Sequence, residues 1–143
     1  MTRALLLSVR PRFAHALLNG TTTVEVRRRF PEVPAGTAIV IYSSSPEKAM
    51  LGTLRIQRFT RTTADEFWRL HSASAGIDRA ELSSYLDGTS HCSALEVENP
   101  QPWARPVTLE ELRLELNLEP AQSFRYLDSC QYAHLLRLAA SQT

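Results

Sequence analysis

The chain has 143 residues, of which 43% are hydrophobic and 22% charged, with a net charge of +1; this composition is typical of one globular domain, expected here to span residues 1–143. No apolar run approaches the roughly 20 residues that cross a bilayer, so we expect no membrane partner. Without a secretion signal, two free thiols at Cys92 and Cys130 are favoured over a disulfide, and the expected location is the cytoplasm.

The hydrophobic pattern of the first half predicts short strands around one helix. Strands are expected over residues 4–9, 21–28, 37–42 and 50–60. A helix is expected over residues 12–19, because Pro11 suits a first turn and Gly20 a helix end. Gly52, inside the long fourth strand, indicates a bulge or a bend.

The second half predicts four helices and fewer strands. The helices are expected to begin at Thr63 or Asp65, at Asp78, at Thr108 and at Ser129, and Thr108 forms a capping box with Glu111. Residues 91–98 alternate as a strand, residues 99–106 are proline-broken and irregular, and residues 120–127 are extended. The pattern predicts an α+β fold in which five or six mostly antiparallel strands curl into a β-barrel surrounded by helices.

The charge is divided unevenly along the chain. Residues 1–61 contain ten basic and three acidic side chains, which gives +7, and residues 62–143 contain six basic and twelve acidic ones, which gives −6. An asymmetry of this size indicates a face that binds a polyanion, so RNA or a nucleotide is the expected partner. The alternative is that the two halves intermix in space and the fields cancel.

Two polar groups on the second strand are candidates for binding. Glu25 and Arg27 are two residues apart and therefore share one face of the strand. They either form a surface salt bridge with each other or lie over a cleft, where Arg27 meets phosphate and Glu25 accepts hydrogen bonds from a base or a sugar. Arg28 follows directly and extends the basic set.

The strongest catalytic candidate is the segment from Tyr42 to Lys48, which follows a buried strand. It offers a phenol, three hydroxyls that include Ser44, and the single lysine of the chain. The alternative is a tyrosine at the sheet rim and an exposed lysine. A second polar patch holds Ser123 and Arg125, which share a face if that stretch is extended. The four histidines lack zinc-site spacing, and no glycine-rich phosphate loop or nucleophile elbow occurs.

These segments form an ordered set of motifs: LLSVRP (residues 6–11), LNG (18–20), VEVRRRFP (24–31), IYSSSP (41–46) and GT (52–53). The set resembles the ASCH domain family (activating signal cointegrator homology). The late string PAQSFRYL (120–127) resembles the close of the bacterial, ribonuclease-like branch of that family. The resemblance implies a PUA-like β-barrel with a cleft beside it, in or near which Ser8, Arg10, Glu25, Arg27 and Arg28 would lie.

The resemblance also implies an activity. Ribonuclease activity in bacterial members of this length has been attributed to a tyrosine, a lysine and a serine, and the matching positions are Tyr42, Lys48 and Ser123. Another branch hydrolyses N4-acetylcytidine, with a lysine two residues after the motif glycine and a threonine three residues later. Thr22 and Glu25 occupy those positions here, so we expect no such amidohydrolase activity.

The sequence therefore predicts an RNA-binding ASCH domain protein with ribonuclease activity on single-stranded RNA. Lys48 would stabilise charge on the phosphate, Tyr42 would move a proton, and Ser123 would position the phosphate or a water. The RNA-binding residues would be Ser8, Arg10, Glu25, Arg27, Arg28, Ser44 and Arg125. No particular cofactor is indicated, because no ligand cluster demands a metal, and assistance by a divalent metal (magnesium or manganese) stays open. The alternatives are a non-catalytic module for a modified base or nucleotide, and an adaptor whose acidic C-terminal helices bind a protein.

Overall fold

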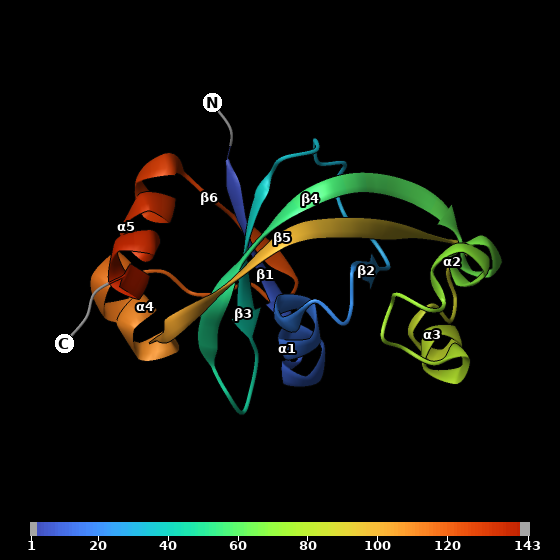
Figure 1. Cartoon of the computed structure of the whole chain (residues 1–143), viewed down its shortest axis with the longest axis horizontal. Coiled ribbons are helices and arrows are strands. Elements are labelled where there is room, and N and C mark those ends of the chain that lie inside the picture. The colour runs from blue at the N-terminus through green and yellow to red at the C-terminus, as the bar shows by residue number, and fades with distance from the viewer. Residues whose placement is uncertain (1–2, 141–143) are drawn as a thin grey trace.

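One six-stranded sheet organises the fold of the computed structural model, which describes residues 3–140 (Figure 1). The strand order is β2-β5-β4-β3-β1-β6, and every neighbouring pair is antiparallel except β1 and β3. The prediction of five or six mostly antiparallel strands is confirmed. The strands are β1 (Ala4–Val9), β2 (Val24–Arg27), β3 (Ala38–Ser43), β4 (Ala49–Thr63), β5 (His91–Thr108) and β6 (Phe124–Leu127).

Within residues 3–140, five helices flank the sheet, two at each end and one beneath its middle (Figure 1). Helices α4 and α5 lie at one end of the molecule, and α2 and α3 at the other. The predicted caps Asp78 and Thr108 form capping boxes, and Thr63, not Asp65, caps α2. The helices are α1 (Pro11–Asn19), α2 (Ala64–His71), α3 (Arg79–Tyr85), α4 (Leu109–Leu116) and α5 (Ser129–Ala140). No helix within residues 3–140 is long and apolar enough to cross a membrane.

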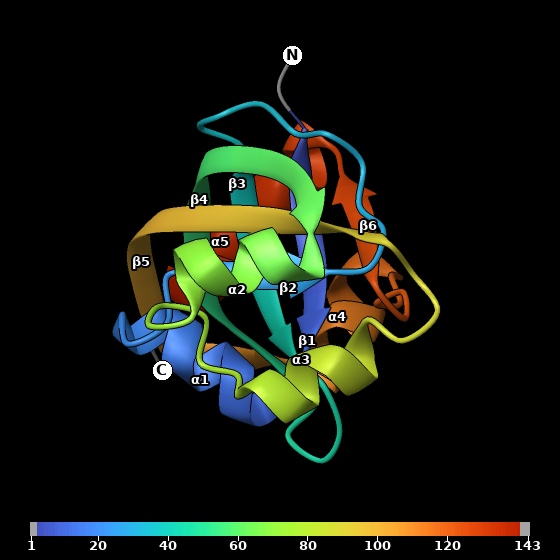
Figure 2. The same ribbon diagram turned by 90° about the vertical axis from the view of Figure 1, so that its right-hand side faces the viewer.

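The prediction of a closed barrel is wrong, because the edge strands β2 and β6 do not pair with each other in the described sheet. The sheet still curls strongly, and β4 and β5 arch across the molecule in Figure 2. Strand β2 has only four residues, Val24–Arg27, and all four pair with β5. Instead of backbone pairing between β2 and β6, the side chain of Arg27 on β2 forms hydrogen bonds with Ser8 of β1 and with Ser123, the residue before β6.

The irregular segment expected at residues 99–106 is instead part of β5, which continues through three prolines. Strand β2 pairs only with residues 93–96 of β5, so the later part of β5 has β4 as its one strand neighbour within the described sheet. Proline is tolerated on an edge of this kind because no ladder hydrogen bond is lost there. The register shifts near Gly52, which lies opposite Pro102, and the predicted bulge is therefore confirmed.

Strands β1 and β3 are neighbours in the interior of the sheet and are buried on both faces. Leu5 and Leu7 pack into one apolar cluster beside α1, while Leu6 packs into a second cluster beside α4 and α5. Because β1 and β3 run parallel, their carboxyl ends lie at the same edge of the sheet. The antiparallel strands β4 and β6 begin at that edge, so the polar segments that follow β1 and β3 meet those that precede β4 and β6.

Candidate functional site

Tyr42 of β3, Ser8 of β1 and Ser123, the residue before β6, form a row at this edge. Ser8 of β1 is the register partner of Tyr42 on β3, and the Ser8 amide donates to the Ser123 carbonyl at 2.9 Å. Tyr42 and Ser123 are thus separated by two strand spacings, on the order of 10 Å. The fold brings together two of the three predicted catalytic residues, which are 81 positions apart in the sequence, 42 and 123.

Tyr42 is nearly enclosed, with 6% of its surface exposed. Burial raises the pKa of its phenol above the usual 10.0, while Arg113 lowers that pKa and Glu119 raises it. The phenol is therefore protonated at neutral pH and can donate a hydrogen bond or a proton, but it is a poor base.

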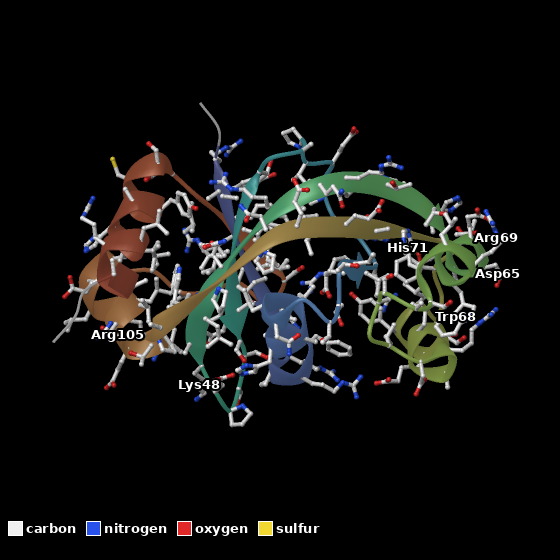
Figure 3. All side chains as sticks on the ribbon, in the orientation of Figure 1. Lys48, Asp65, Trp68, Arg69, His71 and Arg105 are labelled. Carbon is white, nitrogen blue, oxygen red and sulfur yellow. The ribbon has the colours of Figure 1, made fainter. Side chains whose placement is uncertain are left out.

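Lys48 lies on the hairpin that joins β3 to β4, where Figure 3 labels it. The lysine is exposed, its φ of 53° is left-handed, and its carbonyl accepts a hydrogen bond from the Leu109 amide. The neighbouring carboxylate of Glu47 fixes the hairpin, because it accepts a 2.7 Å hydrogen bond from Ser43 Oγ and lies 2.8 Å from His15 Nε2 of α1. Burial alone would raise the pKa of Glu47, but these two contacts outweigh it and hold the pKa below its usual value.

Ser123 is connected through Arg27 to β2, the outer strand on the other side of the sheet from β6. Nη2 of Arg27 donates to Ser123 Oγ at 3.0 Å and to the Ser123 carbonyl at 3.1 Å, and both terminal nitrogens lie 3.3 Å from the Ser8 carbonyl. One side chain from β2 thus bridges to β1 and to the residue before β6. The Ser123 hydroxyl accepts from Arg27, so its own proton is left to donate to a ligand.

A cavity of about 580 Å³ lies between α1, β2 and α3. Arg10, Glu25 and Arg27 line it, as do two aromatic residues, Phe13 and Tyr85. The Glu25 carboxylate accepts from Arg27 at 2.9 Å, with only 12% and 11% of the two side chains exposed. The two residues therefore pair with each other, but the pair is buried rather than at the surface, and both residues line the cavity. Their contact with phosphate, a base or a sugar stays a prediction. Burial raises the pKa of Glu25, and Arg27 opposes that rise only in part.

Four of the predicted binding residues lie outside the cavity lining. The Ser8 hydroxyl donates to the Ala121 carbonyl at 2.7 Å, and the Ser44 amide bonds the end of β1. Arg28 donates to the Asp87 carbonyl at 3.4 Å, behind Tyr85. Arg125 donates to the Glu119 carbonyl at 3.1 Å, on the Tyr42 side of the sheet edge.

The predicted separation of charge is interrupted where acids from the second half reach arginines of the first. Arg12 of α1 pairs with Glu81 of α3 at 2.7 Å, and Arg58 lies 3.9 Å from Glu96. Among residues 3–140, no three His, Cys, Asp or Glu side chains cluster closely enough to suggest a metal site.

Sequence reasoning missed four residues that the fold adds to the site. Phe13 and Tyr85 line the cavity, and Arg113 and Glu119 act on the Tyr42 phenol. In the sequence Phe13 reads as a core residue of an amphipathic helix, and Tyr85 ends a short helix far along the chain. No local signal links either of them to Arg27, because the link is the packing of α1 and α3 beside β2.

Comparison with known proteins agrees with this architecture. Residues 4–114 match the family described as Domain of unknown function (DUF365). An ASCH domain-containing ribonuclease of Zymomonas mobilis is 28% identical over 135 residues, which cover 94% of this chain and 90% of that protein. The crystal structure of ASCH from Zymomonas mobilis superposes with a TM-score of 0.89 at 28% identity and covers 94% of each chain.

More distant structures share the fold alone. Human THYN1, solved in complex with DNA that contains 5-methylcytosine, has a TM-score of 0.64 at 12% identity and covers 99% of this chain. This likeness shows a shared fold, in agreement with the α+β expectation. From the ordered motifs, the match over residues 4–114 and the similarity to ASCH along nearly the whole chain, we conclude that this protein belongs to the DUF365 family and is a member of the ASCH domain family.

Proposed function

We propose that this protein binds single-stranded RNA at the carboxyl ends of β1 and β3 and cleaves it there. The observation that carries the proposal is the row of Tyr42, Ser8 and Ser123, which Arg27 connects to the cavity beside α1. Lys48 extends from the hairpin at the same sheet edge, where its exposed ammonium is free to meet a phosphate.

In the binding step, the cavity would take one nucleotide of the RNA. Phe13 and Tyr85 offer ring faces on which an unstacked base can lie. Arg10 would hold a backbone phosphate, and Glu25 would accept hydrogen bonds from the base or the sugar. Arg28, Ser44 and Arg125 flank this path and would contact the adjoining backbone.

In the chemical step, the ribose 2′-hydroxyl would attack phosphorus and lose its proton to water. The bond to the 5′-oxygen breaks, and that oxygen takes a proton from Tyr42, whose raised pKa keeps the phenol protonated. Lys48 would stabilise the negative charge that develops on the phosphate. Ser123 would position the phosphate through the hydroxyl proton that its bond with Arg27 leaves free.

The comparisons support this proposal through a similar protein. The Zymomonas mobilis relative is named a ribonuclease, and its solved structures include one variant with a tyrosine replaced by phenylalanine and another with a serine replaced by alanine. The residue types replaced in those variants, a tyrosine and a serine, are the types of Tyr42 and Ser123, which are proposed here to move a proton and to position the phosphate.

A second candidate function is binding without cleavage. The observation in its favour is the buried pair of Glu25 and Arg27 at the cavity wall, because a carboxylate beside a guanidinium can read the edge of a base, including a modified one. In that case Tyr42 would have a structural role only and would take no part in a reaction.

The test is incubation of the purified protein with labelled single-stranded RNA, with and without magnesium or manganese. Lys48→Ala and Tyr42→Phe should lose cleavage. Arg137→Ala and Tyr132→Phe on α5, purified identically, should retain it. Equal cleavage by all five proteins would reveal a contaminant and overturn the ribonuclease proposal, whereas binding without cleavage by the wild type would favour the second candidate.

A further inference from the structure

A salt bridge beside Tyr42 has the geometry of a phosphate site that is already filled. Arg113, in the last turn of α4, donates from Nε to Glu119 Oε2 at 2.6 Å and from Nη2 to Glu119 Oε1 at 3.0 Å. Two parallel bonds from one guanidinium are also how arginine holds a phosphate. The Glu119 carboxylate therefore stands where two phosphate oxygens would lie.

The pair lies next to the proposed catalytic tyrosine. Leu112 and Leu118, the chain neighbours of Arg113 and Glu119, pack in the same apolar cluster as Tyr42. The Tyr42 phenol responds electrostatically to both charges of the pair. A phosphate on Arg113 would thus be close to the group that is proposed to move the proton.

A second arginine contributes donors at the same place. Arg125 bonds the main-chain carbonyl of Glu119 through Nη1, and its Nε is buried without a hydrogen-bond partner among the described residues. Buried donors in folded proteins are usually satisfied, so this unused donor on the residue that holds the Glu119 main chain is an exception. A phosphate that replaced Glu119 would bring more acceptor oxygens than the carboxylate.

The contact can open at small cost. Both side chains are more than half exposed, at 54% for Arg113 and 61% for Glu119, and exposed pairs of this kind add little to stability. Glu119 lies in the segment between α4 and β6, outside any helix or strand. By contrast, the pair of Arg105 and Glu111 (Arg105 is labelled in Figure 3) is bound into the α4 capping box and to α5, so it has a structural role.

We propose that Arg113 is a phosphate-binding residue for the RNA and that Glu119 masks it, as an internal carboxylate that the RNA backbone must displace. This inference rests on the proposed RNA binding. It adds a subsite on the α4 side of Tyr42, across the sheet from the cavity at α1. It also assigns Glu119 an inhibitory role.

The test compares Glu119→Gln with Glu66→Gln in binding a labelled single-stranded RNA. Glu66 is the matched control, because it also pairs with an arginine, Arg69, through two bonds and lies on α2 at the opposite end of the molecule. Glu119→Gln should bind about two- to fivefold more tightly, the range expected when one weak competing ion pair is removed. Glu66→Gln should show only the smaller effect of the charge change.

The double variant Arg113→Ala/Glu119→Gln makes the test specific. Arg113→Ala alone should weaken binding and flatten the salt dependence of log K by about 0.7, the loss of one phosphate contact on a single strand. In the Arg113→Ala background, Glu119→Gln should give no more than the Glu66→Gln effect. Thermal unfolding of each variant checks that the fold is intact.

The outcomes separate this inference from the proposed function. Tight binding by the wild type, together with equal effects of Glu119→Gln and Glu66→Gln, would overturn the masking role and leave RNA binding in place. An undiminished effect of Glu119→Gln without Arg113 would also overturn it. Failure of the wild type and all variants to bind RNA would overturn both.

Discussion

Arg27 is the residue that most depends on tertiary context. Its two terminal nitrogens make five hydrogen bonds, to the Glu25 carboxylate, to the Ser8 carbonyl and to Ser123. The sequence leaves two alternatives for Arg27 and Glu25. They form a salt bridge with each other, or they lie over a cleft where Arg27 meets phosphate and Glu25 binds a base or a sugar. The structure shows that Arg27 also joins the edges of a sheet that strand pairing leaves open.

Replacement of Arg27 by Ala should therefore destabilise the fold strongly. The Glu25 carboxyl would stay buried without its partner, a change that typically costs about 3–5 kcal/mol, and the link from β2 to Ser123 would be lost. Urea denaturation measures the free energy of unfolding. Arg137→Ala, at an exposed position of α5, is the control and should cost less than about 1 kcal/mol. A loss of similar size in both variants would contradict this role of Arg27.

The pKa of Tyr42 provides a second test at the scale of single residues. Because Glu119 raises that pKa and Arg113 lowers it, Glu119→Gln should lower it and Arg113→Ala should raise it further. Titration of ring-labelled tyrosine by NMR, assigned with Tyr42→Phe, follows the phenol directly. Glu66→Gln, on α2 at the opposite end of the molecule, is the control variant and should leave the pKa of Tyr42 unchanged.

The same shift has a stability consequence with a defined sign. A folded-state pKa above the usual 10.0 means that the fold favours the protonated phenol. The contribution of Tyr42 is then complete below pH 10 and is lost as the pH rises through the folded-state value. Tyr42→Phe should show a smaller loss of stability than the wild type between neutral and strongly alkaline pH.

At the scale of elements, β4 and β5 approach each other closely at Gly52. A Cβ at this position would lie 2.5 Å from the Gln101 carbonyl oxygen and 2.8 Å from Pro102 Cα, both of them backbone atoms. Strand contact at the bulge thus requires a residue without a side chain. The sequence indicated a bulge at Gly52, but its partner segment was expected to be irregular because of the prolines.

Gly52→Ala should separate the two strands locally. Overpacking of this kind typically costs about 1–3 kcal/mol, and the thermal midpoint reports it. Arg137→Ala, at an exposed position of α5, is the control and should leave the midpoint nearly unchanged. If Gly52→Ala were as stable as the wild type, the close approach of β4 to Pro102 would be incorrect.

At the scale of the whole molecule, the proposed RNA path collects basic groups from distant segments. Arg10 comes from the start of α1, Lys48 from the β3–β4 hairpin and Arg125 from β6, all at one sheet edge. Pairs such as Arg12 with Glu81 neutralise part of the basic half, so the net charge of that half overstates its field. For RNA binding, the positions of the basic side chains along the path matter more than the net charge of residues 1–61.

RNA binding should accordingly weaken steeply with salt. Each phosphate contact on a single strand contributes about −0.7 to the slope of log K against log salt. Arg10→Ala should flatten the slope by about one such contact, and Arg137→Ala should leave it unchanged. Fluorescence anisotropy at several salt concentrations measures both, and a flat slope for the wild type would contradict a phosphate-binding edge.

The sequence by itself determined features that depend on neighbouring residues. The caps at Asp78 and Thr108, the helix end at Gly20 and the strand periodicity were predictable because their physics acts within a few residues. The ordered motifs sufficed to identify the family. They also singled out Tyr42, Lys48 and Ser123, whose catalytic roles stay a prediction.

Only the tertiary structure decided which of these residues meet. Pairing of β1 with β3 and β6 sets Tyr42 and Ser123 in one row, and packing of α1 and α3 around β2 forms the cavity. The passage of β5 through its prolines, the open sheet and the pairing of Arg113 with Glu119 are likewise non-local. Sequence periodicity tells which face of an element is buried but carries no information on which other element covers it, because burial is satisfied equally by any apolar partner.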